Sequence, residues 1–150
     1  MRQIVLILGF LGVFIMKPTV ASRIQNEPTE ISLVEEETPI ILETLTVYNP
    51  TIHQCDMTPL ITASNAKIDT IKLKRQQLRW MALSRNLLKR WKGNFNYGDT
   101  VKLFVGDPQI DGLWIIQDNL NKKYKDRGDL LFDRSIRSLG MWKNVRISKV

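Results

Sequence analysis

The sequence is poor in the residues that build disulfides and closed metal sites. It contains one cysteine, Cys55, and one histidine, His53, so no disulfide can form within the chain. A closed zinc site needs four ligands at a recognisable spacing, and no further Cys or His is present to complete one. A catalytic Cys–His pair would require two side chains on one loop to meet, which a spacing of two residues does not ensure. We therefore expect no metal and no other cofactor, with Cys55 packed as a small apolar residue.

The sequence also lacks an apolar run long enough to cross a bilayer, which takes about 20 residues. Its longest run, residues 4–15, follows the positive start Met1-Arg2 and precedes the small residues Thr19-Val20-Ala21. This order is typical of a secretory signal peptide. We expect residues 1–21 to be such a peptide and the protein to be exported to the periplasm, the cell envelope or the medium. After signal cleavage we expect no stable insertion into the membrane.

Glutamate is missing from the whole chain after residue 43. All six glutamates lie in residues 22–45, together with two prolines and a single arginine, so this segment is predicted to be an acidic flexible linker. The remainder, residues 46–150, carries 19 Lys and Arg against nine Asp, a net charge of about +10. A basic domain outside the cytoplasm favours an anionic partner, such as cell-wall glycan with its acidic peptides, anionic lipid or extracellular nucleic acid.

Helical patterns are scarce in residues 46–150, and short apolar stretches separated by turn signals take their place. Strands are expected within 44–49, 60–64, 78–84, 101–105, 113–118, 129–133 and 142–150. Residues 69–79 are expected to be a loop, and Ser84 to cap a short helix that runs to residue 91. The close spacing of the strands predicts an all-β domain, a small closed barrel or sandwich, with one or two short helices.

Five short motifs follow one another in an order that resembles a known family. They are TVYNP, LITASNAKID, RWMALSRNLL, YGDTVKLF and GLWIIQDNLNKKYKDRGDLLF. Together they resemble the three-aspartate (3D) domain, which is related to rare lipoprotein A and to the membrane-bound lytic transglycosylase A. The resemblance covers residues 46–150. It implies a six- to seven-stranded double-psi β-barrel.

The resemblance also implies a site. Asp118 in IIQDN matches the family aspartate that acts as the catalytic acid in the transglycosylases, and Asp129 in GDLLF matches a second conserved carboxylate. Thr62 and Asn65 belong to a stretch similar to the family's Thr-Ala-(Ser/Thr)-Gly, with Asn65 in place of glycine. Tyr48 matches an aromatic residue near the first strand.

The sequence departs from the family pattern at two places. Ser84 stands where the family has its first aspartate, and Asn119-Leu120 replaces a Thr-Gly pair that follows Asp118. Catalysis is therefore less strongly implied than the fold. The residues expected to bind substrate are Tyr48, Thr62, Ser84, Asn119 and Lys122.

Peptidoglycan or a related acidic glycan is the expected partner, and a monomer is the expected state.

A lytic transglycosylase needs one carboxylic acid, which protonates the leaving oxygen and then accepts the proton of the sugar's own 6-hydroxyl. We predict Asp118 as this acid/base and Asp129 as the neighbour that raises its pKa or orients the substrate. Nearby lysines, among them Lys122 and Lys123, would lower that pKa and oppose the role.

Three other interpretations stay open. Both aspartates could be solvated strand ends, since Asp is common at turns. The barrel could bind glycan without cleaving it. A nucleic-acid-binding domain is supported only by charge and by four tryptophans, and the signal peptide counts against it, so no nucleic-acid partner is expected. The tryptophans, Trp80, Trp91, Trp114 and Trp142, are predicted to be mainly core, with one or two stacking on sugar rings at most.

Overall fold

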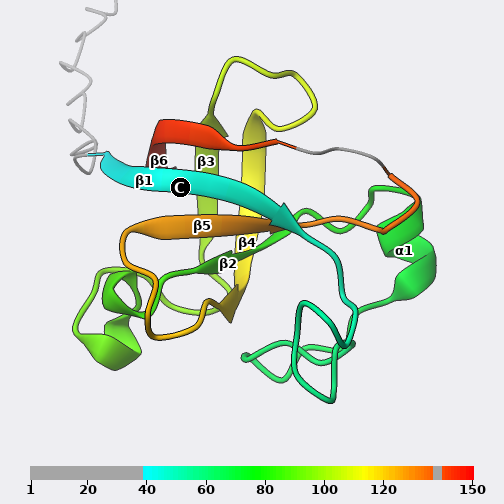
Figure 1. Ribbon diagram of the computed structural model, residues 1–150. Coiled ribbons are helices and arrows are strands. Elements are labelled where there is room, and N and C mark those ends of the chain that lie inside the picture. The colour runs from blue at the N-terminus through cyan, green and yellow to red at the C-terminus, as the bar shows by residue number, and fades with distance from the viewer. Residues whose placement is uncertain (1–38, 137–139) are drawn as a thin grey trace, which may run out of the picture. The chain divides into compact units, whose positions relative to one another are not determined.

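Six strands close into a barrel in the computed structural model, which describes residues 39–136 and 140–150 (Figure 1). The strands are β1 (Ile40–Tyr48), β2 (Trp80–Leu83), β3 (Thr100–Phe104), β4 (Gly112–Asn119), β5 (Arg127–Leu131) and β6 (Trp142–Lys149). Around the barrel their order is β1-β5-β2-β4-β3-β6, and β6 returns to pair with β1. Two pairs, β1–β5 and β2–β4, are parallel, and the other four are antiparallel. The predicted signal peptide, residues 1–21, lies outside the described residues.

Helical structure in the described ranges is limited to one short helix, α1 (Thr70–Lys74), and two 3₁₀ turns, η1 (Arg85–Leu87) and η2 (Lys89–Trp91). The predicted mainly-β closed barrel with short helices is therefore confirmed. The predicted loop over 69–79 is wrong in its first half, because the Asp69 carboxylate accepts hydrogen bonds from the amides of Ile71 and Lys72 and so starts α1. Within these ranges no helix is long and apolar enough to cross a membrane.

The first strand starts earlier than the sequence predicts. Residues 40–45, assigned above to the acidic linker, form the first part of β1 and pair with β6. Leu42 and Leu45 are fully buried there, whereas Glu43 is exposed. The glutamate obscured this apolar pattern in the sequence. The folded domain therefore extends further towards the N-terminus than residue 46.

The barrel interior is filled by alternate residues of its strands. This cluster includes Leu42, Leu45, Met81, Leu83, Val101, Leu103, Trp114, Ile116, Leu130, Val145 and Ile147. Each large apolar side chain that leaves water in this way contributes about 1.5–3 kcal/mol. Gly128 also points inward, because a Cβ there would lie 2.9 Å from the side chains of Leu42 and Leu45. Since neighbours along a strand face opposite sides, Asp129 points outward.

A second apolar cluster lies on the outer face of the barrel. It joins Tyr48 of β1, Ala82 of β2 and Leu131 of β5 to Ile68 and Leu73, which belong to the connection between β1 and β2. This connection, including α1, leaves the end of β1 and packs back over the strands (Figure 1). One outer face of the sheet is thus covered by chain rather than by water.

A β-bulge in β4 decides which way Asp118 faces. Met81 of β2 pairs with Ile116, but the next residue, Ala82, pairs with Asp118, so Gln117 is an extra residue in β4. In an unbroken strand Asp118 would share the inward face of Ile116. The bulge instead places it on the outer face with Ala82. Bulges commonly re-aim a side chain in this manner beside functional sites.

Candidate functional site

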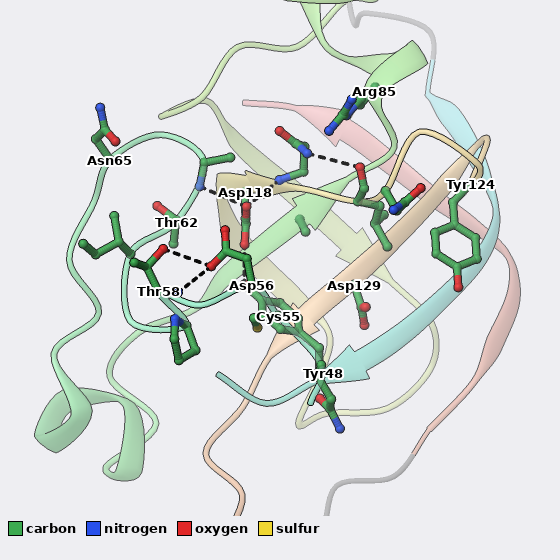
Figure 2. A pocket seen from close by; sticks show the side chains of 18 of the residues that line it. Tyr48, Cys55, Asp56, Thr58, Thr62, Asn65, Arg85, Asp118, Tyr124 and Asp129 are labelled. Atoms are coloured by element: carbon green, nitrogen blue, oxygen red, sulfur yellow. Dashed lines mark hydrogen bonds between the residues drawn. The ribbon is translucent and has the colours of Figure 1, made fainter. Parts of the chain in front are cut away.

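A pocket of about 850 Å³ opens on the outer face of β1, β5, β2 and β4, under the connection from β1 to β2 (Figure 2). Its volume is in the range of small-molecule and sugar sites. Five of the residues predicted from the sequence line it: Tyr48, Thr62, Asp118, Asn119 and Asp129. None of the four tryptophans is among the described residues of its wall.

Both aspartates stand in one row across the sheet. Ala82 of β2 pairs with Asp118 on one side and with Asp129 on the other, and Asp129 pairs in turn with Thr46 of β1. Residues paired in this way share one face of the sheet. Two strand spacings separate the Cα atoms of the aspartates, so they lie about 10 Å apart. Ala82 contributes only a methyl group to the pocket floor, so the space between the two carboxylates stays open. Figure 2 shows the side chains of both aspartates at the pocket.

The Asp129 carboxyl keeps its proton to a higher pH than an ordinary aspartate does. Burial raises the pKa of its carboxyl from 3.8 to about 6, the Thr46 hydroxyl opposes this rise, and the charge of Asp118 adds to it. The Thr46 Oγ1 donates a 2.9 Å hydrogen bond to Oδ1 of Asp129. In the described part of the chain this is the only hydrogen bond that the carboxylate accepts. A carboxyl with these properties can donate a proton and take one back.

Asp118 has a different environment. Its Oδ1 accepts hydrogen bonds from the amides of Ala63, at 3.0 Å, and Asn119, at 2.8 Å. The Tyr48 hydroxyl donates to its Oδ2 at 3.3 Å. Burial raises the pKa of the Asp118 carboxyl, and these three donors lower it, leaving a net upward shift. The donors favour the ionised form, so Asp118 is better suited to remain a carboxylate than to release a proton.

Tyr48 donates a hydrogen bond to Asp118, and the charges of Asp118 and Asp129 both act on its phenol. Burial, followed by the charge of Asp118, raises the pKa of the Tyr48 phenol well above its usual value. The hydroxyl therefore stays protonated and acts as a hydrogen-bond donor. Its ring packs in the outer apolar cluster, which fixes the direction of that bond.

A tight turn carries the Ala63 amide to Asp118. The Ser64 amide donates to the carbonyl of Gln117 at 3.2 Å, and the Ser64 Oγ donates to Oε1 of the same residue at 2.6 Å. Asn65 takes a left-handed conformation with φ of 66°, which glycine adopts freely and asparagine tolerates. The strand predicted over 60–64 is wrong, because only Ile61 pairs, through a single bridge to Lys67.

Two predicted binding residues lie outside the pocket wall. Ser84 is fully buried, and its hydroxyl accepts a 3.0 Å hydrogen bond from the Arg127 amide instead of capping the turn that follows it. Lys122 is exposed on the loop between β4 and β5.

Burial remains the largest influence on the pKa of both aspartates, and both shifts are upward. The lysines of the loop between β4 and β5 therefore do not bring about the expected fall in the pKa of Asp118.

Arg85 and Tyr124 are among the lining residues that sequence reasoning missed. Arg85 opens η1 directly after Ser84, and its guanidinium lies over the Trp91 ring at 5.2 Å. Ser84, the residue before Arg85, had been matched to a family aspartate, so the motif pointed to a position one residue away. Tyr124 follows the run of lysines and was hidden by it.

Cys55 also lines the pocket, half-buried against the outer cluster. Its Sγ donates to the Asn49 carbonyl at 3.6 Å, and burial raises the pKa of its thiol. Across residues 39–136 and 140–150, no group of three or more His, Cys, Asp or Glu side chains gathers as a metal site would require.

Comparison with protein-family models gives no match to this chain, and comparison with curated protein sequences gives none either. The resemblance to the three-aspartate family therefore rests on the motifs quoted above.

Proposed function

We propose that this protein cleaves the glycan of peptidoglycan as a lytic transglycosylase, in the manner that its likeness to the three-aspartate family implies. The observation that supports this most directly is a pair of half-buried carboxylates in one pocket that differ in their hydrogen bonds: Asp129 accepts one in the described residues, and Asp118 accepts three. Two carboxyl groups in different surroundings can take different roles in acid–base chemistry. On this proposal the protein acts as a monomer at the cell envelope.

The contacts favour Asp129, rather than Asp118, as the acid/base. Asp129 has a pKa of about 6 and accepts one hydrogen bond in the described residues, so it is partly protonated near neutral pH. Asp118 accepts three hydrogen bonds, which hold its oxygens in place and favour its charge. This reverses the roles that the sequence suggested for the pair.

The reaction would proceed in two proton transfers at Asp129. Its carboxyl gives a proton to the glycosidic oxygen as the bond from that oxygen to the anomeric carbon breaks. Positive charge develops at the anomeric carbon, and the Asp118 carboxylate across the Ala82 floor stabilises it. The Asp129 carboxylate then accepts the proton of the sugar's 6-hydroxyl, whose oxygen bonds to the anomeric carbon. No water is consumed, and the acid is regenerated.

Product analysis tests the proposal. The full chain, incubated with purified peptidoglycan, is expected to release fragments with 1,6-anhydro ends, detected by mass spectrometry. Asp129→Asn should abolish release, and Asp133→Asn should leave it intact, because Asp133 lies on the exposed loop after β5 and outside the pocket wall. Products with ordinary reducing ends would identify a hydrolase instead, and release that persists in Asp129→Asn would rule out the acid assignment.

A second candidate is a barrel that binds glycan without cleaving it. Both Asp118 oxygens accept hydrogen bonds from protein donors, which favours this alternative because it gives Asp118 a structural role. Retention on insoluble cell wall, without any soluble product, would support it.

A further inference from the structure

Arg85 gives the pocket a cationic end. The residue starts η1, immediately after β2, and lines the same pocket as the two aspartates. Figure 2 shows it at one edge of the pocket, well apart from Tyr48 and Asp129. The pocket is thus acidic along the Asp118–Asp129 row and basic at this edge.

The Arg85 side chain has an unused donor. Its Nε is buried and has no hydrogen-bond partner. Within the described ranges the guanidinium also forms no ion pair, since the pairs found there are Arg127–Glu43 and Lys149–Asp99. Its packing over Trp91 at 5.2 Å fixes the plane of the group without satisfying its N–H donors. Native proteins leave few buried donors unpaired, and Arg85 lines the pocket, so a ligand bound there can supply the guanidinium with an acceptor.

We propose that Arg85 binds a carboxylate carried by the substrate, so that the pocket selects acidic glycan over neutral glycan. This rests on the proposed glycan-cleaving function and adds to it the group on the substrate that the pocket recognises and the residue that binds it. A guanidinium presents a planar fork of donors that matches a carboxylate. The two aspartates repel an anionic group from the other end of the pocket. Attraction at Arg85 and repulsion at the aspartate row together set the direction in which the glycan lies.

The carboxylate has two sources in peptidoglycan: the peptide stem or the lactyl group of the sugar itself. Three ligands of equal glycan length distinguish these two sources of the carboxylate. Stem-bearing chains carry stem carboxylates, amidase-stripped chains carry the free lactyl carboxylate, and chitin oligosaccharide carries neither. Binding is measured by calorimetry on the full chain in mild detergent, with Asp129→Asn present in every variant to prevent cleavage.

The test variant is Arg85→Gln, and Arg90→Gln is its matched control. Arg90 also lies over the Trp91 ring, at 5.4 Å, but it is exposed and is not part of the pocket wall. Arg85→Gln should weaken binding of the acidic glycan roughly tenfold, the loss of one charge-assisted contact, and leave chitin binding unchanged. Arg90→Gln should bind like its parent. Arg85→Lys should recover only part of the loss, because lysine lacks the fork.

The outcomes separate this inference from the function on which it rests. If the parent prefers stem-bearing chains to stripped ones, the stem supplies the carboxylate. If it prefers stripped chains to stem-bearing ones, the lactyl group supplies it, and equal binding of both above chitin means that either carboxylate serves. Equal binding of all three ligands, or an Arg85→Gln variant that matches its parent, overturns the inference and leaves glycan binding standing. If no glycan binds but a free stem peptide does, in an Arg85-dependent manner, the carboxylate site stands and the glycan function fails. Binding of neither overturns both.

Discussion

The backbone amide of Ala63 donates a 3.0 Å hydrogen bond to Oδ1 of Asp118, although 55 residues separate the two in the chain. This bond ties the turn around Ala63 to the end of β4. The same oxygen accepts the Asn119 amide, so one side chain fixes both the turn and the strand end. Asp118 is therefore an anchor for the pocket wall.

Asp118→Ala should loosen that wall. The Ala63 amide and the Tyr48 hydroxyl would lose their acceptor, and the unpaired hydroxyl of the buried Tyr48 costs about 1–3 kcal/mol. We expect a lower free energy of unfolding in denaturant titration and faster hydrogen exchange at the Ala63 amide. Asp118→Asn, which keeps one acceptor oxygen, should lose less. Unchanged exchange at Ala63 in Asp118→Ala would contradict the anchoring role.

Asp129→Asn should stabilise the protein at neutral pH. The pKa of Asp129 is raised to about 6 in the folded chain, so between about pH 4 and pH 6 the folded state binds more protons than the unfolded state. Stability consequently falls as the pH rises through that range, and asparagine removes this loss. We expect a gain of about 1–2 kcal/mol near pH 7.5, less than the full shift implies because the pocket is open to water. Thermal unfolding near pH 3.5 should show no gain, and an equal gain at both pH values would exclude titration as its cause.

Ala82→Leu should close the floor between the two carboxylates. Ala82 pairs with both aspartates and lines the pocket, so a larger side chain there occupies the space in which a sugar would lie. Glycan binding by pull-down or calorimetry should fall at least about tenfold. Met81→Leu, one residue away inside the barrel, should cost less than about 1.5 kcal/mol of stability and leave binding intact. Equal binding by both variants would mean that the ligand does not pass between the aspartates.

Asn65→Gly should be tolerated, and Asn65→Val should not. Residue 65 has φ of 66°, which is costly for a β-branched side chain and free of strain for glycine. We expect Asn65→Val to lose about 1–2 kcal/mol of unfolding free energy and to weaken the Ala63–Asp118 contact through the displaced turn. Chemical denaturation of both variants measures the difference. Similar stability of the two would indicate that the turn rearranges at little cost.

Much of the barrel could be predicted because its strands alternate along the chain. Val101 and Leu103 face inward with exposed Lys102 between them, and Val145 and Ile147 do the same around exposed Arg146. Such alternation is a local property and survives in the sequence alone. The beginning of β1 was missed since Glu43 interrupts its apolar pattern.

The arrangement of the pocket was harder to predict. That Asp118 and Asp129 share it follows from pairing with Ala82, a contact between segments far apart in the chain. Their different hydrogen-bond partners depend on a turn and on Thr46, whose position no local pattern specifies. Family likeness supplied the two residues, but only the fold distinguishes their environments.

The extra residue at Gln117 has a consequence for any shortened form of the chain. Deleting it would restore strict alternation to β4, and the aspartate, then directly after the inward-facing Ile116, would still point outward. The deletion would instead remove the two oxygens that hold Ser64, the Gln117 carbonyl and its side-chain Oε1. A one-codon deletion would thus keep the direction of the carboxylate and release the neighbouring turn from the sheet.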